Sequence, residues 1–164
     1  TKGKVFSMKV YEIPESGKQA RGKLISNLIK LSEDEKVSTV IKVREFEKEK
    51  TLFFITKDGV VKKTELTLFA NINKTGIRAL TLRDEDELKF VGLTSGSEKD
   101  EIFIATRNGI SIRFSEEDVR AMGRTAAGVK GITLRDKDYV VAAVIINPHM
   151  ELEKLSVMTI TEEG

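Results

Sequence analysis

One series of landmarks occurs three times along the chain, and this repetition limits the possible fold more than any other feature. Each series begins with a turn glycine, and these glycines are Gly3, Gly59 and Gly109. A second glycine follows in a basic loop 17 or 19 residues later, at Gly22, Gly76 and Gly128. An acidic turn, a run of strand-forming residues and a further apolar strand complete each series. Successive turn glycines stand 56 and 50 residues apart, and repeats of about 50 residues indicate solenoids or propellers.

Most of the repeated segments have the composition of β-strands. Val, Ile, Phe and Thr dominate runs of five to eight residues such as "TLFFIT" and "EIFIAT". The pairs "DG" at 58–59 and "NG" at 108–109 favour tight hairpin turns, because Gly and Asn tolerate a positive φ. We expect short helical turns after residues 64 and 114, and the aromatic residues Phe53, Phe54, Phe103 and Phe114 in the core.

A four-stranded sheet cannot bury both of its faces alone, so it stacks on copies of itself. The sequence therefore predicts an all-β, propeller-like array of four-stranded blades of about 50 residues each. The predicted units are 1–52, 53–103 and 104–158, with 159–164 starting the next unit. Gly164 falls where a further turn glycine would stand, and Thr1 lies inside a hairpin pattern. We accordingly expect the parent protein to contain more blades.

Composition excludes several classes of protein and site. The 164 residues include no Cys, and no apolar run approaches the ~20 residues of a membrane span. His149 is the single histidine and stands in a loop, so no catalytic set is predicted. The acidic runs 32–35 and 83–87 lack the spacing of a calcium loop. We interpret them as solvent-exposed turns and predict no metal site.

Positive charge recurs once in each unit, although Lys and Arg (28) barely exceed Asp and Glu (26) overall. The net charge is +4 over residues 1–25, +3 over 57–80 and +2 over 107–130. Equivalent elements of stacked blades lie at one height, so these charges would form a band suited to a polyanion. Duplex DNA carries a charge every ~1.7 Å along its axis, which a continuous band can follow. Glycines in the basic loops, including "GVKG" at 128–131, would allow a close approach to phosphate.

We predict contacts with the phosphate backbone of double-stranded DNA, which carry no base sequence information. The candidate residues are Lys18, Arg21, Lys23, Lys62, Lys63, Lys74, Arg78, Arg113, Arg124 and Lys130. A propeller that serves as a protein-interaction scaffold, without a DNA role, is the alternative that the modest net charge leaves open.

Three segments resemble the C-terminal domain of DNA gyrase A, the β-pinwheel of type IIA bacterial topoisomerases. They are "KVYEIPESGKQARGK" (9–23), "FFITKDGVVKKTELTLF" (53–69) and "GISIRFSEEDVRAMGRTAAGVKGI" (109–132). The resemblance implies a disc of six blades, of which this chain holds three, with strands exchanged between neighbours. The basic box Gln-Arg-Arg-Gly-Gly-Lys-Gly of the family's first blade is absent. The related C-terminal domain of topoisomerase IV therefore stays an alternative.

The resemblance also implies a function for the parent protein. DNA wrapped on this module would be presented for ATP-dependent negative supercoiling by a complex of two gyrase A and two gyrase B chains. The catalytic tyrosine, ATP and Mg²⁺ would belong to other parts of that complex, so no enzyme activity and no cofactor are expected in this segment. A cytoplasmic, nucleoid-associated location in bacteria is implied, with no membrane partner.

Overall fold

The computed structural model describes residues 2–32, 35–97 and 99–160, and its described part is all-β, without an α-helix. The predicted turn at Gly164 lies outside the described residues. The described residues form nine strands: β1 (Lys4–Val5), β2 (Thr51–Thr56), β3 (Val60–Glu65), β4 (Ile77–Arg78), β5 (Leu88–Leu93), β6 (Glu101–Thr106), β7 (Ser111–Ser115), β8 (Val129–Lys130) and β9 (Val140–Ile146). They also form five short 3-10 helices: η1 (Val10–Glu12), η2 (Ile25–Asn27), η3 (Leu66–Phe69), η4 (Glu116–Asp118) and η5 (Leu152–Lys154).

The predicted hairpins form where the glycine pairs stand. Strands β2 and β3 pair antiparallel around Gly59, and β6 and β7 pair antiparallel around Gly109. Their φ angles of +77° and +79° lie in the left-handed region, which glycine adopts without steric cost. The predicted helical turns also form, as η3 and η4. The hydroxyl of Ser115 caps η4 by accepting a hydrogen bond from the amide of Glu117 at 3.2 Å.

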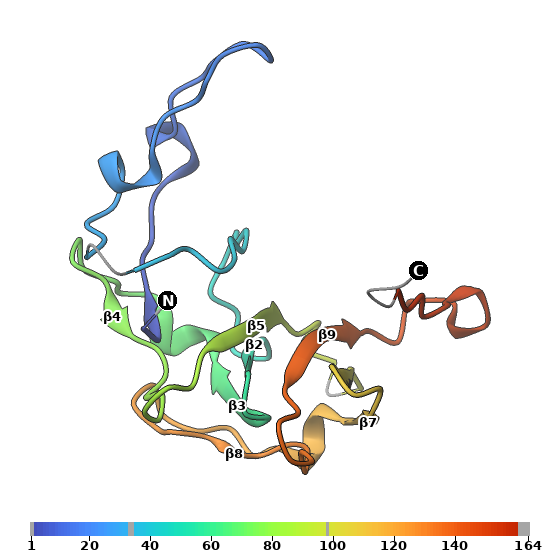
Figure 1. The fold of residues 1–164 in the computed structure, drawn as a ribbon. Helices are drawn as coiled ribbons and strands as arrows, with labels where there is room; N and C mark the ends of the chain where they lie inside the picture. Colours follow the sequence, from blue (N-terminus) through green and yellow to red (C-terminus); the bar gives the residue numbers. More distant parts are fainter. Residues whose placement is uncertain (1, 33–34, 98, 161–164) are drawn as a thin grey trace.

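The three sheets exchange strands along the chain. The largest sheet has the order β5-β2-β3-β8, the next has the order β7-β6-β9, and β1 pairs with β4. Strand β8 belongs to the third repeat but pairs with β3 of the second, and β4 of the second repeat pairs with β1 of the first. In Figure 1 the chain passes through β8 beside β3 before it returns to the third sheet as β9. The second and third repeats thus each supply an edge strand to the repeat before them, as the resemblance implies.

The apolar core has two layers, one on each side of the β2–β3 sheet. Phe53 and Ile55 of β2 pack with Ile102 and Ile104 of β6, between the second and third units. The alternate residues Leu52 and Phe54 face a second cluster that also contains Leu66, Phe69, Ala79 and Leu80. Side chains alternate across a strand, so the apolar run of β2 is buried on both faces. The middle sheet therefore has the stacked neighbours that its composition predicts.

The first unit departs from the predicted four-stranded blade. In blades two and three the central strands β2 and β6 each pair on both sides. Within the described residues, the first unit contributes only β1, which pairs with β4. The run of strand-forming residues after the first unit's acidic turn, residues 37–43, does not form a strand, and the segment that contains η1 and η2 extends away from the sheets (Figure 1). Residues 155–160 form no strand, so among the described residues only the middle sheet reaches four strands. The predicted unit boundaries stay a prediction.

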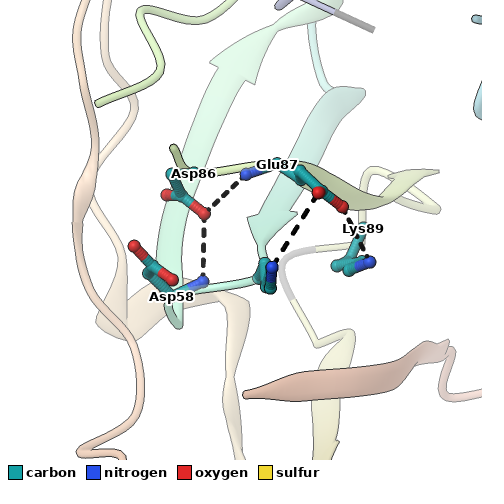
Figure 2. Close-up of polar contacts among 5 residues, drawn as sticks. Asp58, Asp86, Glu87 and Lys89 are labelled. Atoms are coloured by element: carbon teal, nitrogen blue, oxygen red, sulfur yellow. Dashed lines mark hydrogen bonds and ion pairs between the residues drawn. The ribbon is translucent and has the colours of Figure 1, made fainter. Parts of the chain in front are cut away.

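The acidic turns are more than solvent-exposed loops, because their central carboxylate is buried against a hairpin turn. Figure 2 shows Asp86, whose Oδ1 accepts hydrogen bonds from the amides of Asp58 (3.0 Å) and Glu87 (2.8 Å). In the next repeat Oδ1 of Asp138 accepts from the amides of Asn108 (3.0 Å) and Tyr139 (2.9 Å). In both units one buried Asp of the acidic turn thus binds the backbone of the hairpin turn, an arrangement that we call the carboxylate clamp. This corrects the interpretation of these turns as solvent-exposed loops.

Hydrogen bonding outweighs desolvation at the clamp of the third unit. Removal from water raises the pKa of Asp138, but hydrogen bonds from the Thr106 hydroxyl and from the amides of Asn108 and Tyr139 lower it further than burial raises it. The net pKa lies below the usual value for Asp. The carboxylate is therefore held in its charged form, which is the stronger acceptor.

One core position of β3 holds a charged residue. Lys62 is fully buried opposite Phe54, with its Nζ 5.7 Å from the centre of the Phe54 ring. Its Nζ donates hydrogen bonds to the carbonyl oxygens of Ala79 (2.6 Å) and Arg124 (2.5 Å). Burial lowers the pKa of this amine from 10.5 to about 8, because the charged form is poorly solvated in the core.

Replacement of the clamp carboxylate should destabilise the fold. Asp138→Ala leaves the amides of Asn108 and Tyr139 without their acceptor, and we expect it to lower the free energy of unfolding by about 1–3 kcal/mol. Asp136→Ala, at an exposed acid of the same turn, is the matched control and should change it by less than ~0.5 kcal/mol. Urea unfolding measures both, and equal losses in the two variants would contradict a specific clamp.

The buried amine of Lys62 should make stability depend on alkaline pH. Between pH of about 8 and 10.5 the unfolded chain binds more protons at this group than the folded chain, so unfolding becomes less favourable as the pH rises. Relative to Lys62→Met, which does not titrate, the unsubstituted protein should gain roughly 2–3 kcal/mol across this window. Denaturation curves for both proteins at several pH values measure the difference. A constant difference would show that Lys62 titrates normally.

Candidate nucleic-acid interface

The loops that follow η3 and η4 present cations at equivalent positions. Lys74 and Arg78 flank Gly76 in the second unit, and Arg124 and Lys130 flank Gly128 in the third. Lys74, Arg78 and Lys130 are exposed, and Arg124 is half-buried. Within the described ranges, none of these four side chains has a carboxylate at ion-pair distance. Their charge is therefore available to an external anion.

The two loops are joined to each other rather than separate. The Thr81 hydroxyl donates a hydrogen bond to the carbonyl of Thr125 at 2.8 Å, and Lys62 bridges the carbonyls of Ala79 and Arg124. The amide of Met122 donates to the carbonyl of Lys63 at 2.8 Å, so the third unit's loop begins on the edge of β3. These contacts bring Arg78 and Arg124, which stand in different repeats, to one side of the middle sheet.

The candidates of the first unit lie elsewhere in the structure. Lys18, Arg21 and Lys23 are exposed in the segment between η1 and η2. This segment rises away from the sheets in Figure 1, so the structure does not place these cations beside the other two loops. Arg21 and Lys23 line a shallow depression together with Ile13, Pro14 and Leu28.

Three further candidates have protein partners. Lys62 is buried and hydrogen-bonded, so the prediction of a phosphate contact does not fit its position. Lys63 is half-buried, and its Nζ donates to the carbonyl of Glu116 at 2.9 Å. Arg113 is exposed, but its Nε lies 3.3 Å from a carboxylate oxygen of Glu101 across the β6–β7 pair. Arg120, which is not among the candidates, is exposed in the third unit's loop.

The glycines of "GVKG" serve the packing of neighbouring units rather than an approach to phosphate. A Cβ added at Gly128 would lie 2.6 Å from the carbonyl oxygen of Val61, and one at Gly131 would lie 2.3 Å from Cγ1 of the same residue. Gly128 also has a φ of +90°. These glycines let β8 approach β3 closely, and a side chain at either position would force the two strands apart.

Neither a metal centre nor a membrane-spanning helix is found in the part of the chain that the structure describes. Among residues 2–32, 35–97 and 99–160, no three His, Asp or Glu side chains gather as metal ligands would. In the same ranges, no helix has the length and apolar composition needed to span a bilayer.

Sequence comparisons place the chain among known proteins. Residues 1–44, 50–95 and 100–147 match the family model described as DNA gyrase C-terminal domain, beta-propeller. DNA gyrase A of Halalkalibacterium halodurans is 52% identical over 132 residues, which are 80% of this chain and 16% of that protein. DNA gyrase A of Staphylococcus epidermidis is 45% identical over 99% of this chain and 18% of its own length. The chain thus spans less than a fifth of these curated relatives.

Two solved structures share the fold. The C-terminal domain of DNA topoisomerase IV has a TM-score of 0.80 and 33% identity, over 89% of this chain and 45% of that one. The DNA gyrase A C-terminal domain has a TM-score of 0.71 and 24% identity, over 88% and 45%, a likeness that concerns the fold alone. With three family matches that together cover most of its length, the chain belongs to the family of DNA gyrase C-terminal domains, which are β-propellers.

Proposed function

We propose that the chain binds double-stranded DNA through its basic loops, by contacts with the phosphate backbone. The observation that carries the proposal is the equivalence of Lys74 and Arg78 with Arg124 and Lys130 in two loops that are hydrogen-bonded to each other. Cations that recur at equivalent positions of stacked units follow one path, which a regularly charged duplex can occupy. The absence of ion pairs to these four side chains in the described ranges supports the same path.

The binding is expected to be independent of base sequence. Lys and Arg contacts with phosphate fix the position of a duplex but read no bases. The four aromatic residues predicted in the core are all buried or half-buried, so none is placed to stack on exposed bases. Preferences between duplexes would then arise from how easily each one bends along the basic loops.

In the parent protein, we infer that this module wraps DNA and presents it for ATP-dependent negative supercoiling by an A2B2 complex with gyrase B. The curated gyrase A relatives at 43–52% identity support this. ATP, Mg²⁺ and the catalytic tyrosine would belong to other parts of that complex. The location would be the bacterial cytoplasm, in association with the nucleoid.

Affinity should fall steeply as salt rises. Each phosphate that the protein neutralises contributes about −0.9 to the slope of log K against log salt. If the four loop cations each neutralise a phosphate, the slope should be about −3 to −4 for the complete protein on a random-sequence duplex. Fluorescence anisotropy at several salt concentrations measures it. A flat response, together with recovery of protein partners from a nuclease-treated extract, would favour the scaffold alternative.

Charge reversal in the basic loops should weaken DNA binding, whereas charge reversal in an acidic turn should not. Lys74→Glu and Arg124→Glu should each weaken binding about tenfold or more, and equally on duplexes of different sequence, because repulsion replaces a phosphate contact. Lys137→Glu is the matched control, since it makes the same charge change at an exposed position where the second repeat has Glu85, with nearly the same φ (+59° and +64°). The control should bind nearly as the unsubstituted protein does. A loss that is restricted to one DNA sequence, or is equal in all three variants, would contradict the proposed path.

A further inference from the structure

The position of Lys62 is apolar in the other two repeats. Three residues after the turn glycine stand Phe6 in the first unit, Lys62 in the second and Ile112 in the third. In two units this position also packs on the second glycine of the following repeat. The Phe6 ring lies 2.7 Å from a Cβ added at Gly76, and Cβ of Lys62 lies 3.3 Å from one added at Gly128. Lys62 thus places a charged side chain at a position where the repeat otherwise packs an apolar one.

A buried lysine is not explained by packing alone. The side chain is fully buried, and within the described ranges no carboxylate forms an ion pair with it. Burial of an amine without an opposite charge is unfavourable, and an apolar side chain such as Phe6 or Ile112 avoids that cost. What the amine adds over an apolar side chain is its pair of hydrogen bonds to two backbone carbonyls.

Those two carbonyls belong to the two basic loops. Ala79 directly follows Arg78 at the end of β4, and Arg124 is itself a candidate contact in the third unit's loop. A single Nζ therefore joins backbone segments 45 residues apart in sequence. From this geometry we infer that Lys62 is a positioning residue, which holds the third unit's basic loop beside that of the second so that a duplex meets both at once. The inference rests on the proposed DNA binding.

Thr81 makes a second, uncharged link between the same loops. Its hydroxyl donates to the carbonyl of Thr125 at 2.8 Å, next to the carbonyl that Lys62 holds. The equivalent residue of the third unit, Thr133, is exposed, and its side chain makes no hydrogen bond within the described ranges. The chain therefore offers a pair of Thr→Val variants, one that removes a loop link and one that does not, with no change of charge.

Loss of a link should act through pre-organisation rather than through a lost phosphate contact. A loosened loop can still reach the DNA, but it must be ordered on binding, which lowers the affinity by the same factor at every salt concentration. A residue that itself neutralises a phosphate also lowers the salt slope by about 0.9 when it is removed. Salt titrations therefore distinguish a positioning residue from a contact residue.

The test uses the complete protein with the variants Lys62→Met, Thr81→Val, Thr133→Val and Lys74→Met. We expect Lys62→Met to weaken duplex binding about three- to tenfold and Thr81→Val about two- to fivefold, each with a salt line parallel to that of the unsubstituted protein. Lys74→Met should make the salt slope less steep by about 0.9, and Thr133→Val should change neither the affinity nor the slope. In the absence of DNA, amide hydrogen exchange over residues 121–131 should be faster in the first two variants only.

Each outcome decides the inference. Thr81→Val keeps every charge and changes one surface hydroxyl, so it keeps the test valid even if Lys62→Met unfolds. If the unsubstituted protein binds DNA and both link variants match it in affinity and in exchange, Lys62 does not position the loops, and the proposed function is unaffected. If Lys62→Met lowers the slope as Lys74→Met does, Lys62 contacts phosphate itself, which overturns the inference. If the unsubstituted protein shows no salt-dependent binding, the proposed function is wrong and the inference is wrong with it.

Discussion

The structure depends on the edge strands that the second and third repeats each contribute to the sheet of the repeat before them. Strand β8 pairs with β3 across the boundary between the second and third units, and Gly128 and Gly131 are small enough for the two backbones to meet there. Because β8 follows directly on the basic loop 121–128, the pairing that completes the sheet also carries that loop to the edge of the neighbouring unit. In the third repeat, fold and charge distribution thus have one cause, because the strand that completes the neighbouring sheet begins directly after the cation-bearing loop.

Buried polar groups hold the turns and loops that connect the strands. The carboxylates of Asp86 and Asp138 close the two hairpins from within, and the amine of Lys62 joins the two loops. All three charged side chains are buried or nearly so, and each is hydrogen-bonded to backbone groups distant in sequence. Interactions of this kind stabilise one arrangement over similar ones, because an alternative packing would leave a buried charge without partners.

The repeats made the hairpins, the 3-10 turns and the fold class predictable. Gly59 and Gly109 specify their turns locally, and Ser115 with the acids after it specifies a cap. The local sequence does not reveal the roles of the acidic turns and Lys62, because the hydrogen-bond partners that hold them in the core lie 17 to 62 residues away, and nothing local distinguishes a buried charge from a solvated one. The strand-forming run at 37–43 forms no strand, because composition alone does not supply the neighbouring strand that a sheet needs.

The central claim is that exposed cations of neighbouring repeats face one duplex, and lysine acylation with mass spectrometry tests it most directly. The rates at Lys74, Lys130 and Lys137, all exposed, would be compared with and without saturating DNA on the complete protein. The account predicts that DNA slows acylation of Lys74 and Lys130 and leaves Lys137 unchanged. Full reactivity of Lys74 and Lys130 in the complex, or equal protection of all three, would contradict it.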